Sequence, residues 1–221
     1  LATGGTLSDN AWTHPLVVEA EALAMFLFGP SDGVARLVPV LAGFGAIALL
    51  WPLRRRVGRG AALGAAVLLA LSPTMVFTAR QAGAGSLLVA GSLLVLVLLL
   101  HHLSQPTTLS AVATGAAAGL LLLTGPLGWV ALPLTAGAGI AMAGGRRARP
   151  RDLSGLAVGL LLVLITLSTA LFTRPGGFSE FLSASLGALW REHLANAGTQ
   201  WWMTPLVLVV DEFLLLVLAV V

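Results

Sequence analysis

Residues 84–100 read AGSLLVAGSLLVLVLLL, a stretch without a single charge. As an α-helix it would extend about 25 Å, close to the roughly 30 Å hydrocarbon core of a bilayer. Comparable apolar stretches lie at 37–53, 61–79, 109–124, 126–143, 153–172 and 204–221. These lengths predict an all-α, polytopic transmembrane helix bundle of about seven spans.

The composition of the whole chain agrees with a membrane protein. Its 221 residues are 57% hydrophobic and only 10% charged, and the mean hydropathy is +0.97. A soluble domain would carry about a quarter charged residues. The sequence contains no Cys, Lys or Tyr, which excludes disulfides and thiolate metal sites and disfavours catalysis by an amine or a phenol.

Arginine placement predicts how the chain crosses the membrane. Eight of the twelve arginines lie in two short loops: Arg54, Arg55, Arg56 and Arg59, and Arg146, Arg147, Arg149 and Arg151. With seven spans both loops fall on one side, which the positive-inside rule makes cytoplasmic. We therefore expect a plasma-membrane protein whose N-terminus is extracytoplasmic and whose C-terminus is cytoplasmic. Arginines placed this way are typical of a topology signal, so no nucleic-acid partner is expected.

The segment before the first span has the features of a helix that does not cross the membrane. Residues 15–29 are too short and too acidic to span, with Pro15 in the first turn and Gly29-Pro30 at the end. Leu16, Leu23, Phe26 and Leu27 share one face, as in an interfacial helix on the outer leaflet.

This topology divides the chain into four parts. They are an extracytoplasmic segment (1–35), a six-span bundle (36–173), an extracytoplasmic loop (174–203) and an incomplete last span (204–221). Because the chain starts at Leu1 and stops within an apolar run, we expect it to be a fragment of a longer protein. Membrane lipid is then an expected partner throughout the bundle.

Small residues recur at a spacing that favours close helix packing. Gly115 and Gly119 form one such pair, and Gly137 and Ala141 form another. A small residue every fourth position lets two helix backbones approach closely in a membrane. Both pairs are predicted to lie against neighbouring helices.

Few polar side chains interrupt the apolar sequence. Arg80, at the outer end of a span, is either a phosphate-gripping guanidinium or a snorkelling interfacial arginine. Asp9 and His14 are either an acid–base pair or solvated capping groups. His101-His102 is either an interfacial pair or a source of an axial nitrogen for a haem-like cofactor. No spacing of His and carboxylates suits a metal cluster, so no metal ligand is predicted.

Several stretches together resemble a known family. Residues 13–58 hold a His-Pro start, a helix ending Leu-Phe-Gly and an Arg-Leu-x-Pro that opens a span, and 71–83 and 119–129 hold a Ser-Pro…Ala-Arg stretch and a glycine-rich span. This order resembles glycosyltransferase family 39, the dolichyl-phosphate-mannose protein mannosyltransferase-like enzymes of the GT-C fold.

The C-terminal part is similar to one branch, the bacterial and archaeal flippase-associated membrane glycosyltransferases. There, Phe-Thr-x-Pro-x-Gly ends a span, then a Trp, a His, a Gly-Gln-x-Trp-like element and an acidic residue follow. The corresponding stretches here are LFTRPGGF (171–178), LWREH (189–193), AGTQWW (197–202) and VVDEF (209–213).

The resemblance implies a function and a site. Such enzymes transfer a sugar from a polyprenyl-phosphate donor at the extracytoplasmic face. Their catalytic base is acidic and would lie upstream of Leu1. The substrate-binding residues it implies here are Asp9, His14, Arg80, Glu192, His193, Gln200 and Trp201. No cofactor is firmly implied, and a divalent cation is left open.

The sequence also departs from the family pattern. Gly125 stands where the family has a Lys, Gly83–Gly85 replace expected acids, and Trp202-Met203 replace tyrosines. A phosphate site without that Lys and those acids has less electrostatic stabilisation. The alternative is therefore a non-catalytic helical subunit that keeps the fold and packs with other membrane subunits in a larger complex.

Overall fold

The computed structural model describes residues 13–81, 83–144, 150–170, 172–173 and 175–191, and this part of the chain contains helices and no strand. The predicted all-α fold is confirmed. The helices are α2 (Pro15–Phe28), α3 (Asp32–Ala35), α4 (Leu37–Val57), α5 (Arg59–Leu71), α6 (Pro73–Arg80), α7 (Gly85–Ser104), α8 (Thr108–Leu123), α9 (Pro126–Met142), α10 (Pro150–Ser168) and α11 (Gly177–Ala188).

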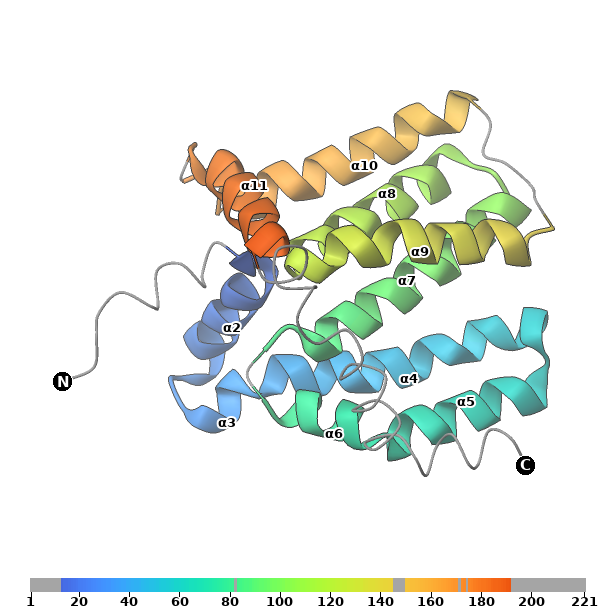
Figure 1. Ribbon diagram of the computed structural model, residues 1–221, viewed down its shortest axis with the longest axis horizontal. Helices are drawn as coiled ribbons and strands as arrows, with labels where there is room; N and C mark the ends of the chain where they lie inside the picture. Colours follow the sequence, from blue (N-terminus) through green and yellow to red (C-terminus); the bar gives the residue numbers. More distant parts are fainter. Residues whose placement is uncertain (1–12, 82, 145–149, 171, 174, 192–221) are drawn as a thin grey trace.

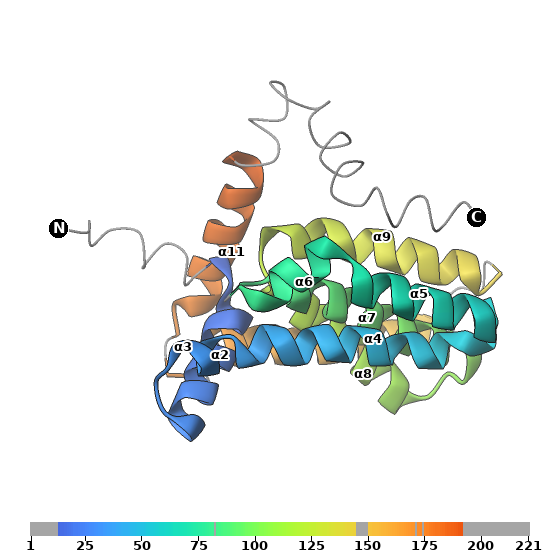
Figure 2. The same ribbon diagram turned by 90° about the horizontal axis from the view of Figure 1, so that it is seen from below.

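The long helices lie side by side, and the chain reverses at the two ends of the bundle (Figure 1). One end carries α2, α3, α11, the α8–α9 turn and the end of α6, and we name it the His14 end. The opposite end carries the α4–α5 and α7–α8 connections, and we name it the Arg55 end. Figure 2 shows the same separation from a second direction.

The helices differ in whether they are long and apolar enough to cross a membrane. By length and composition, Asp32–Val57 and Gly85–Ser104 qualify, and α5 with α6 makes a third if the bent pair is one span. The apolar helices Thr108–Leu123, Pro126–Met142 and Asp152–Ser168 are shorter. Every predicted span up to residue 172 corresponds to a helix or a helix pair, whereas 204–221 lies outside the described residues. The total of seven stays a prediction.

The predicted span at 61–79 is broken in the structure. Helices α5 and α6 meet at an angle of 56°. Pro73 has no backbone N–H to continue the helical ladder, and the Ser72 hydroxyl instead accepts a hydrogen bond from the Met75 N–H over 3.1 Å. The second helix therefore starts with its own cap and carries Arg80 to the His14 end.

Helices α8 and α10 approach each other closely through glycines of both. A Cβ at Gly115 would lie 2.0 Å from the Leu156 carbonyl oxygen, and one at Gly159 would lie 2.0 Å from the Val112 carbonyl oxygen. The predicted role of Gly115 in packing is confirmed.

The second predicted packing pair does not contact another described helix. Among the described residues, a Cβ at Gly137 would meet no atom within 4 Å, and Ala141 is exposed. That face of α9 points away from the described helices. Its neighbour is instead contacted through Gly139, where a Cβ would lie 2.8 Å from Leu99 Cδ2 on α7.

Helix α2 forms over nearly the predicted range and lies across the His14 end (Figure 1). Gly29 ends it with a φ of +86°. Leu23 and Phe26 are exposed, as an interfacial helix requires, but Leu16 packs on the cluster that contains Phe181. The N-terminal turn of α2 is thus attached to the bundle, and the rest presents apolar surface outward.

The predicted outer loop at 174–203 contains helix α11. Phe181 on this helix is fully buried and stacks on Trp129 of α9, with ring centroids 6.4 Å apart. An aromatic contact of this kind adds to the apolar area that each ring buries. The contact holds α11 beside the start of α9 at the His14 end.

Candidate functional site

His14 bridges the start of α2 and the α8–α9 turn. Its Nδ1 lies 2.6 Å from the Thr124 carbonyl oxygen. Because a carbonyl oxygen only accepts, Nδ1 carries the proton and donates, which leaves the lone pair of the neutral ring on Nε2. The hydrogen bond gives His14 an architectural role at this end. Its predicted role in substrate binding stays a prediction.

Gly125 provides the space that the His14 ring occupies. A Cβ at this position would lie 2.2 Å from His14 Nδ1, and the backbone φ is +133°. Both the overlap and the dihedral exclude an unstrained side chain here. The family's Lys at this position therefore cannot be accommodated in this arrangement of His14.

Arg80 lies in a polar pocket at the His14 end. The pocket has a volume of about 360 Å³, and its described lining is Asp32, Ala35, Arg36, Arg80 and Gln81. Helix α3 supplies the first two residues, Arg36 follows it, and α6 supplies Arg80 at its last position. Two guanidinium groups from separate helices thus face the same space.

An apolar groove leads to the same arginine. It has a volume of about 230 Å³ and runs between α4 and the broken pair α5–α6. The described residues that line it are Val40, Gly43, Phe44, Ile47, Leu69, Ala70, Met75, Val76, Ala79 and Arg80. Arg80 is the charged residue among them and lies at the junction of the groove and the polar pocket.

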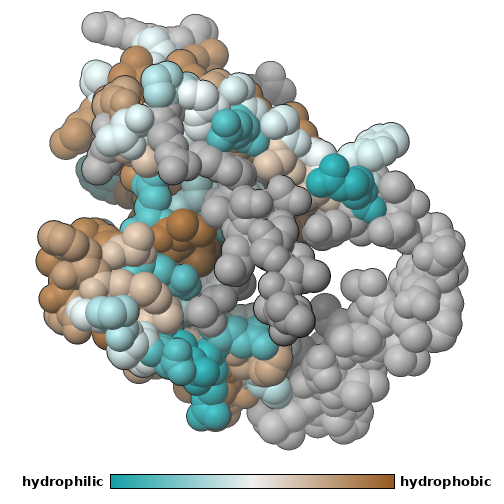
Figure 3. Space-filling model, turned by 90° about the vertical axis from the view of Figure 1, so that its left-hand side faces the viewer, coloured by the Kyte–Doolittle hydropathy of each residue, from teal (hydrophilic) through white to brown (hydrophobic). Residues whose placement is uncertain are grey.

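The two arginines of the pocket keep their charge available. Neither Arg36 nor Arg80 forms an ion pair with a carboxylate of the described ranges, and both are exposed. Asp32 lines the pocket without pairing with either guanidinium at 4.0 Å or less. Figure 3 views this end of the molecule and shows hydrophilic surface beside strongly hydrophobic surface. The combination suits a ligand with an anionic group and an apolar tail.

Helix α2 adds two half-buried carboxylates near this end. Burial raises the pKa of Glu19 and the pKa of Glu21. Oε1 of Glu21 is buried and has no hydrogen-bond partner in the described part of the protein. The charged form of Glu21 is therefore disfavoured where it lies.

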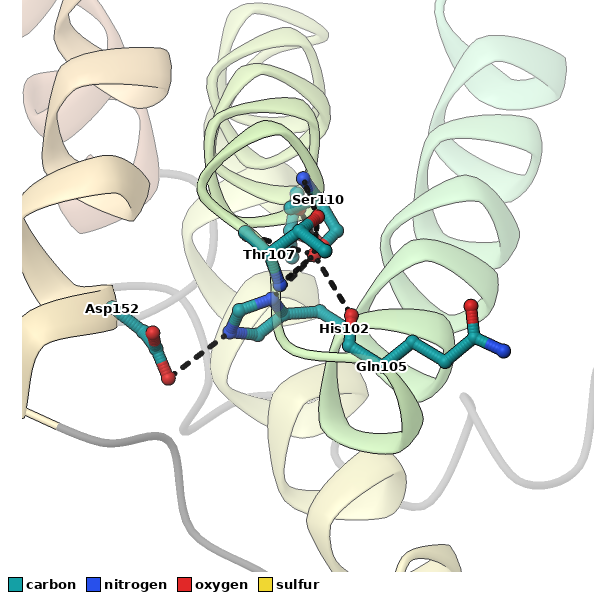
Figure 4. A network of polar contacts seen from close by, with 6 residues as sticks. His102, Gln105, Thr107, Ser110 and Asp152 are labelled. Carbon is teal, nitrogen blue, oxygen red and sulfur yellow. Dashed lines mark hydrogen bonds and ion pairs between the residues drawn. The ribbon is translucent and has the colours of Figure 1, made fainter.

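The two histidines at 101–102 lie in different environments, although both would be exposed in an interfacial pair. His101 is exposed, but His102 is fully buried, with Nδ1 2.8 Å from the Ser110 hydroxyl and Nε2 3.6 Å from Asp152 Oδ2 (Figure 4). The second distance exceeds hydrogen-bond length, and Nε2 has no hydrogen-bond partner among the described residues. That contact is electrostatic and attractive when the ring is protonated.

The buried histidine connects three helices at the Arg55 end. Ser110 also caps α8 with Thr107, and Asp152 belongs to the first turn of α10. Both ring nitrogens of His102 are directed at protein groups, so the ring is placed to hold α7, α8 and α10 together. An axial-ligand role is not supported for His102.

Two of the predicted site residues lie within the described ranges. Arg80 and His14 both lie at the His14 end, but His14 is not part of the described lining of the Arg80 pocket. The remaining predicted residues lie outside the described ranges: Asp9, Glu192, His193, Gln200 and Trp201.

Sequence reasoning missed Arg36, Asp32 and Gln81 as pocket residues. A signal was present for Arg36, because it directly precedes the first span as Arg80 ends the second. Within the described residues, no group of three or more His, Asp or Glu is placed to hold a metal ion. The divalent cation therefore stays an open expectation.

Apolar helices of membrane-spanning length and an amphiphilic site at one end define an integral membrane protein of all-helical fold. Residues 13–172 match the family model described as dolichyl-phosphate-mannose-protein mannosyltransferase. The match covers most of the chain, so the protein belongs to this family of GT-C-type membrane glycosyltransferases. No curated protein and no solved structure matches the chain.

Proposed function

We propose that the protein binds a polyprenyl-phosphate sugar at the His14 end and transfers the sugar at the extracytoplasmic face. Arg80 and Arg36 bind the phosphate, and the first isoprene units lie in the apolar groove between α4 and α5–α6. The observation that carries the proposal is the position of Arg80 at the junction of that groove with the polar pocket.

The chemistry of the two spaces matches the two parts of such a donor. A guanidinium binds phosphate oxygens through two parallel N–H donors, and a second guanidinium stabilises the remaining charge. The groove is lined by Val40, Phe44, Ile47 and other apolar side chains, which suit a hydrocarbon tail. Asp32 supplies a carboxylate that accepts hydrogen bonds from sugar hydroxyls.

One observation favours a second function, binding without transfer in a helical subunit of a larger complex. At position 125 the His14 ring takes the space that a Lys side chain would need. A cation at this position would stabilise developing phosphate charge during transfer. Without that cation the protein would still bind a lipid phosphate, but it would lack part of the charge stabilisation that transfer needs.

Binding of a polyprenyl phosphate to the purified full-length protein in detergent tests the site. Arg80→Gln is expected to weaken binding about tenfold to a hundredfold, since hydrogen bonds to charged groups contribute about 1.5–3 kcal/mol. Arg80→Lys keeps the charge, and its affinity is expected to lie between those of wild-type protein and Arg80→Gln. Arg59→Gln is the matched control, because Arg59 is exposed and lies at the Arg55 end. Equal affinity of Arg80→Gln and wild-type protein would exclude the proposed site.

A transfer assay then separates the two functions. With a polyprenyl-phosphate donor whose sugar is radiolabelled, an active enzyme transfers the label from the lipid to an acceptor. Arg80→Gln should reduce the rate of this transfer. Tight binding without transfer by the full-length protein, together with co-purification in a stoichiometric complex, would favour the subunit.

A further inference from the structure

A second charged hollow lies at the Arg55 end, where α4 and α7 finish side by side. Its volume is about 630 Å³, within the range of small-molecule sites. The polar groups that line it are Arg54, Arg55, Arg56, His101, Ser104 and Gln105. Helix α4 has 21 residues, so this hollow is roughly 30 Å from the arginine that begins the helix at the His14 end.

The three arginines of the hollow are held differently. Arg54 donates from Nη1 to the Trp51 carbonyl oxygen over 2.9 Å, and its guanidinium lies 3.9 Å above the Trp51 ring. Arg56 donates from Nη2 to the Ser104 hydroxyl, which joins α4 to α7. Arg55 has no side-chain hydrogen bond or ion pair to the described residues. Its guanidinium therefore has all of its N–H donors available for a ligand, and Arg56 keeps those that do not bind Ser104.

The charge of the hollow is positive and uncompensated. Its described lining includes three arginines and no Asp or Glu. The contact at this end between His102 and Asp152 involves neither Arg55 nor Arg56. An anion placed here meets the cations of one helix end, and one of them, Arg56, is held by Ser104 of α7.

The remaining lining is apolar and continues along the helices. Val97 and Leu98 line the hollow from α7, one to two turns below its end, and Trp51 lines it from α4 with 54% of its surface exposed. Trp and Arg at a helix end are typical of the membrane–water boundary. The hollow therefore has a charged mouth and an apolar seam, which a soluble anion does not require.

We propose that this hollow binds an anionic glycerophospholipid, with Arg55 and Arg56 on the headgroup phosphate and an acyl chain along the α4–α7 seam. Basic pockets between helices on the cytoplasmic side suit such headgroups, and the arginine distribution predicts that side for this end. The site does not depend on the proposed function, because it lies at the other end of the bundle and shares no lining residue with the Arg80 pocket.

Lipid retention and affinity test the proposal on the full-length protein. Native mass spectrometry in mixed micelles of phosphatidylglycerol and phosphatidylcholine should show wild-type protein retaining phosphatidylglycerol. Arg55→Gln is expected to weaken its binding about fivefold, from about 1 kcal/mol per arginine near the surface. Arg55→Lys should keep most of the affinity, and the Arg55→Gln/Arg56→Gln double variant should bind still more weakly.

Arg59→Gln is the control that isolates the hollow from general charge. It removes one positive charge from the same connection, yet Arg59 does not line the hollow, so affinity should change less than twofold. Equal losses in Arg59→Gln and Arg55→Gln would overturn the site in favour of diffuse attraction. Displacement of the lipid by millimolar inorganic phosphate would identify a soluble-anion site instead, and failure of wild-type protein to retain phosphatidylglycerol would also reject the proposal.

Discussion

Nδ1 of His14 donates a hydrogen bond to the Thr124 carbonyl oxygen over 2.6 Å, between residues 110 positions apart in the chain. The bond fastens the first turn of α2 to the turn between α8 and α9. It also explains why the residue after Thr124 is glycine, because the His14 ring occupies the space of a Cβ at Gly125. His14 and the Thr124-Gly125 turn form one structural unit at the end of the bundle where the donor site is proposed.

Replacing His14 tests the strength of this contact. His14→Ala leaves the Thr124 carbonyl oxygen without its side-chain partner and should lower the free energy of unfolding by about 1–3 kcal/mol. His14→Asn retains an N–H donor near the position of Nδ1 and should lose less. Thermal unfolding in detergent measures both. Equal stability of His14→Ala and wild-type protein would contradict the architectural role.

Replacing Gly125 tests the space beside the ring. Gly125→Ala should cost about 2–4 kcal/mol of stability, from the positive φ and from overlap with His14. In a His14→Ala background the overlap is gone, so the cost should fall by about 1–3 kcal/mol. Gly144→Ala is the matched control, since Gly144 has a φ of +68° and open space around its Cβ position. Additive effects of the His14 and Gly125 substitutions would show that the two do not interact.

Replacing Gly115 tests the contact of α8 with α10. Gly115→Ala places a methyl group against the Leu156 carbonyl oxygen and should destabilise the protein by about 1–3 kcal/mol. Gly137→Ala meets open space within α9 and should be neutral or stabilising by up to about 1 kcal/mol. Unfolding of both variants in detergent gives the comparison. A loss for Gly137→Ala as large as that for Gly115→Ala would reject the packing explanation.

Glu21 predicts a pH dependence of stability. Burial raises its pKa in the folded protein above 4.5, so folding favours the protonated form. The stability that protonation supports is present below about pH 4.5 and is lost as the pH rises through the folded pKa. Wild-type protein should therefore lose stability as the pH rises through the folded pKa of Glu21, whereas Glu21→Gln, which cannot ionise, should not show this loss.

The control for this titration is Glu180→Gln, because Glu180 is an exposed carboxylate in the first turn of α11. Melting temperatures at several pH values should give a flatter curve for Glu21→Gln than for wild-type protein, and Glu180→Gln controls for the loss of one carboxylate. Parallel curves for all three proteins would refute the role of Glu21.

Much of the candidate site could not be predicted, and particular residues show why. Arg80 was identified because it ends an apolar stretch and matches a family position. Arg36 and Gln81 have local sequences that are equally typical of an interfacial residue, so only the packing of α3 and α4 beside α6 reveals the shared pocket. The sequence favours a place for His102 at the membrane interface beside His101, yet α8 and α10 pack against it and bury it.

The sequence by itself determined that this is an all-helical membrane protein, where its helices lie, and to which family it belongs. The physical reason is that lipid cannot satisfy backbone N–H and C=O groups, so each long apolar stretch must form a helix. The tertiary structure alone decided which helices are neighbours, because the apolar faces are nearly uniform and many pairings bury them equally well. The shared pocket of Arg36 and Arg80 and the contacts of His14 with Thr124 and Gly125 follow from that arrangement of helices.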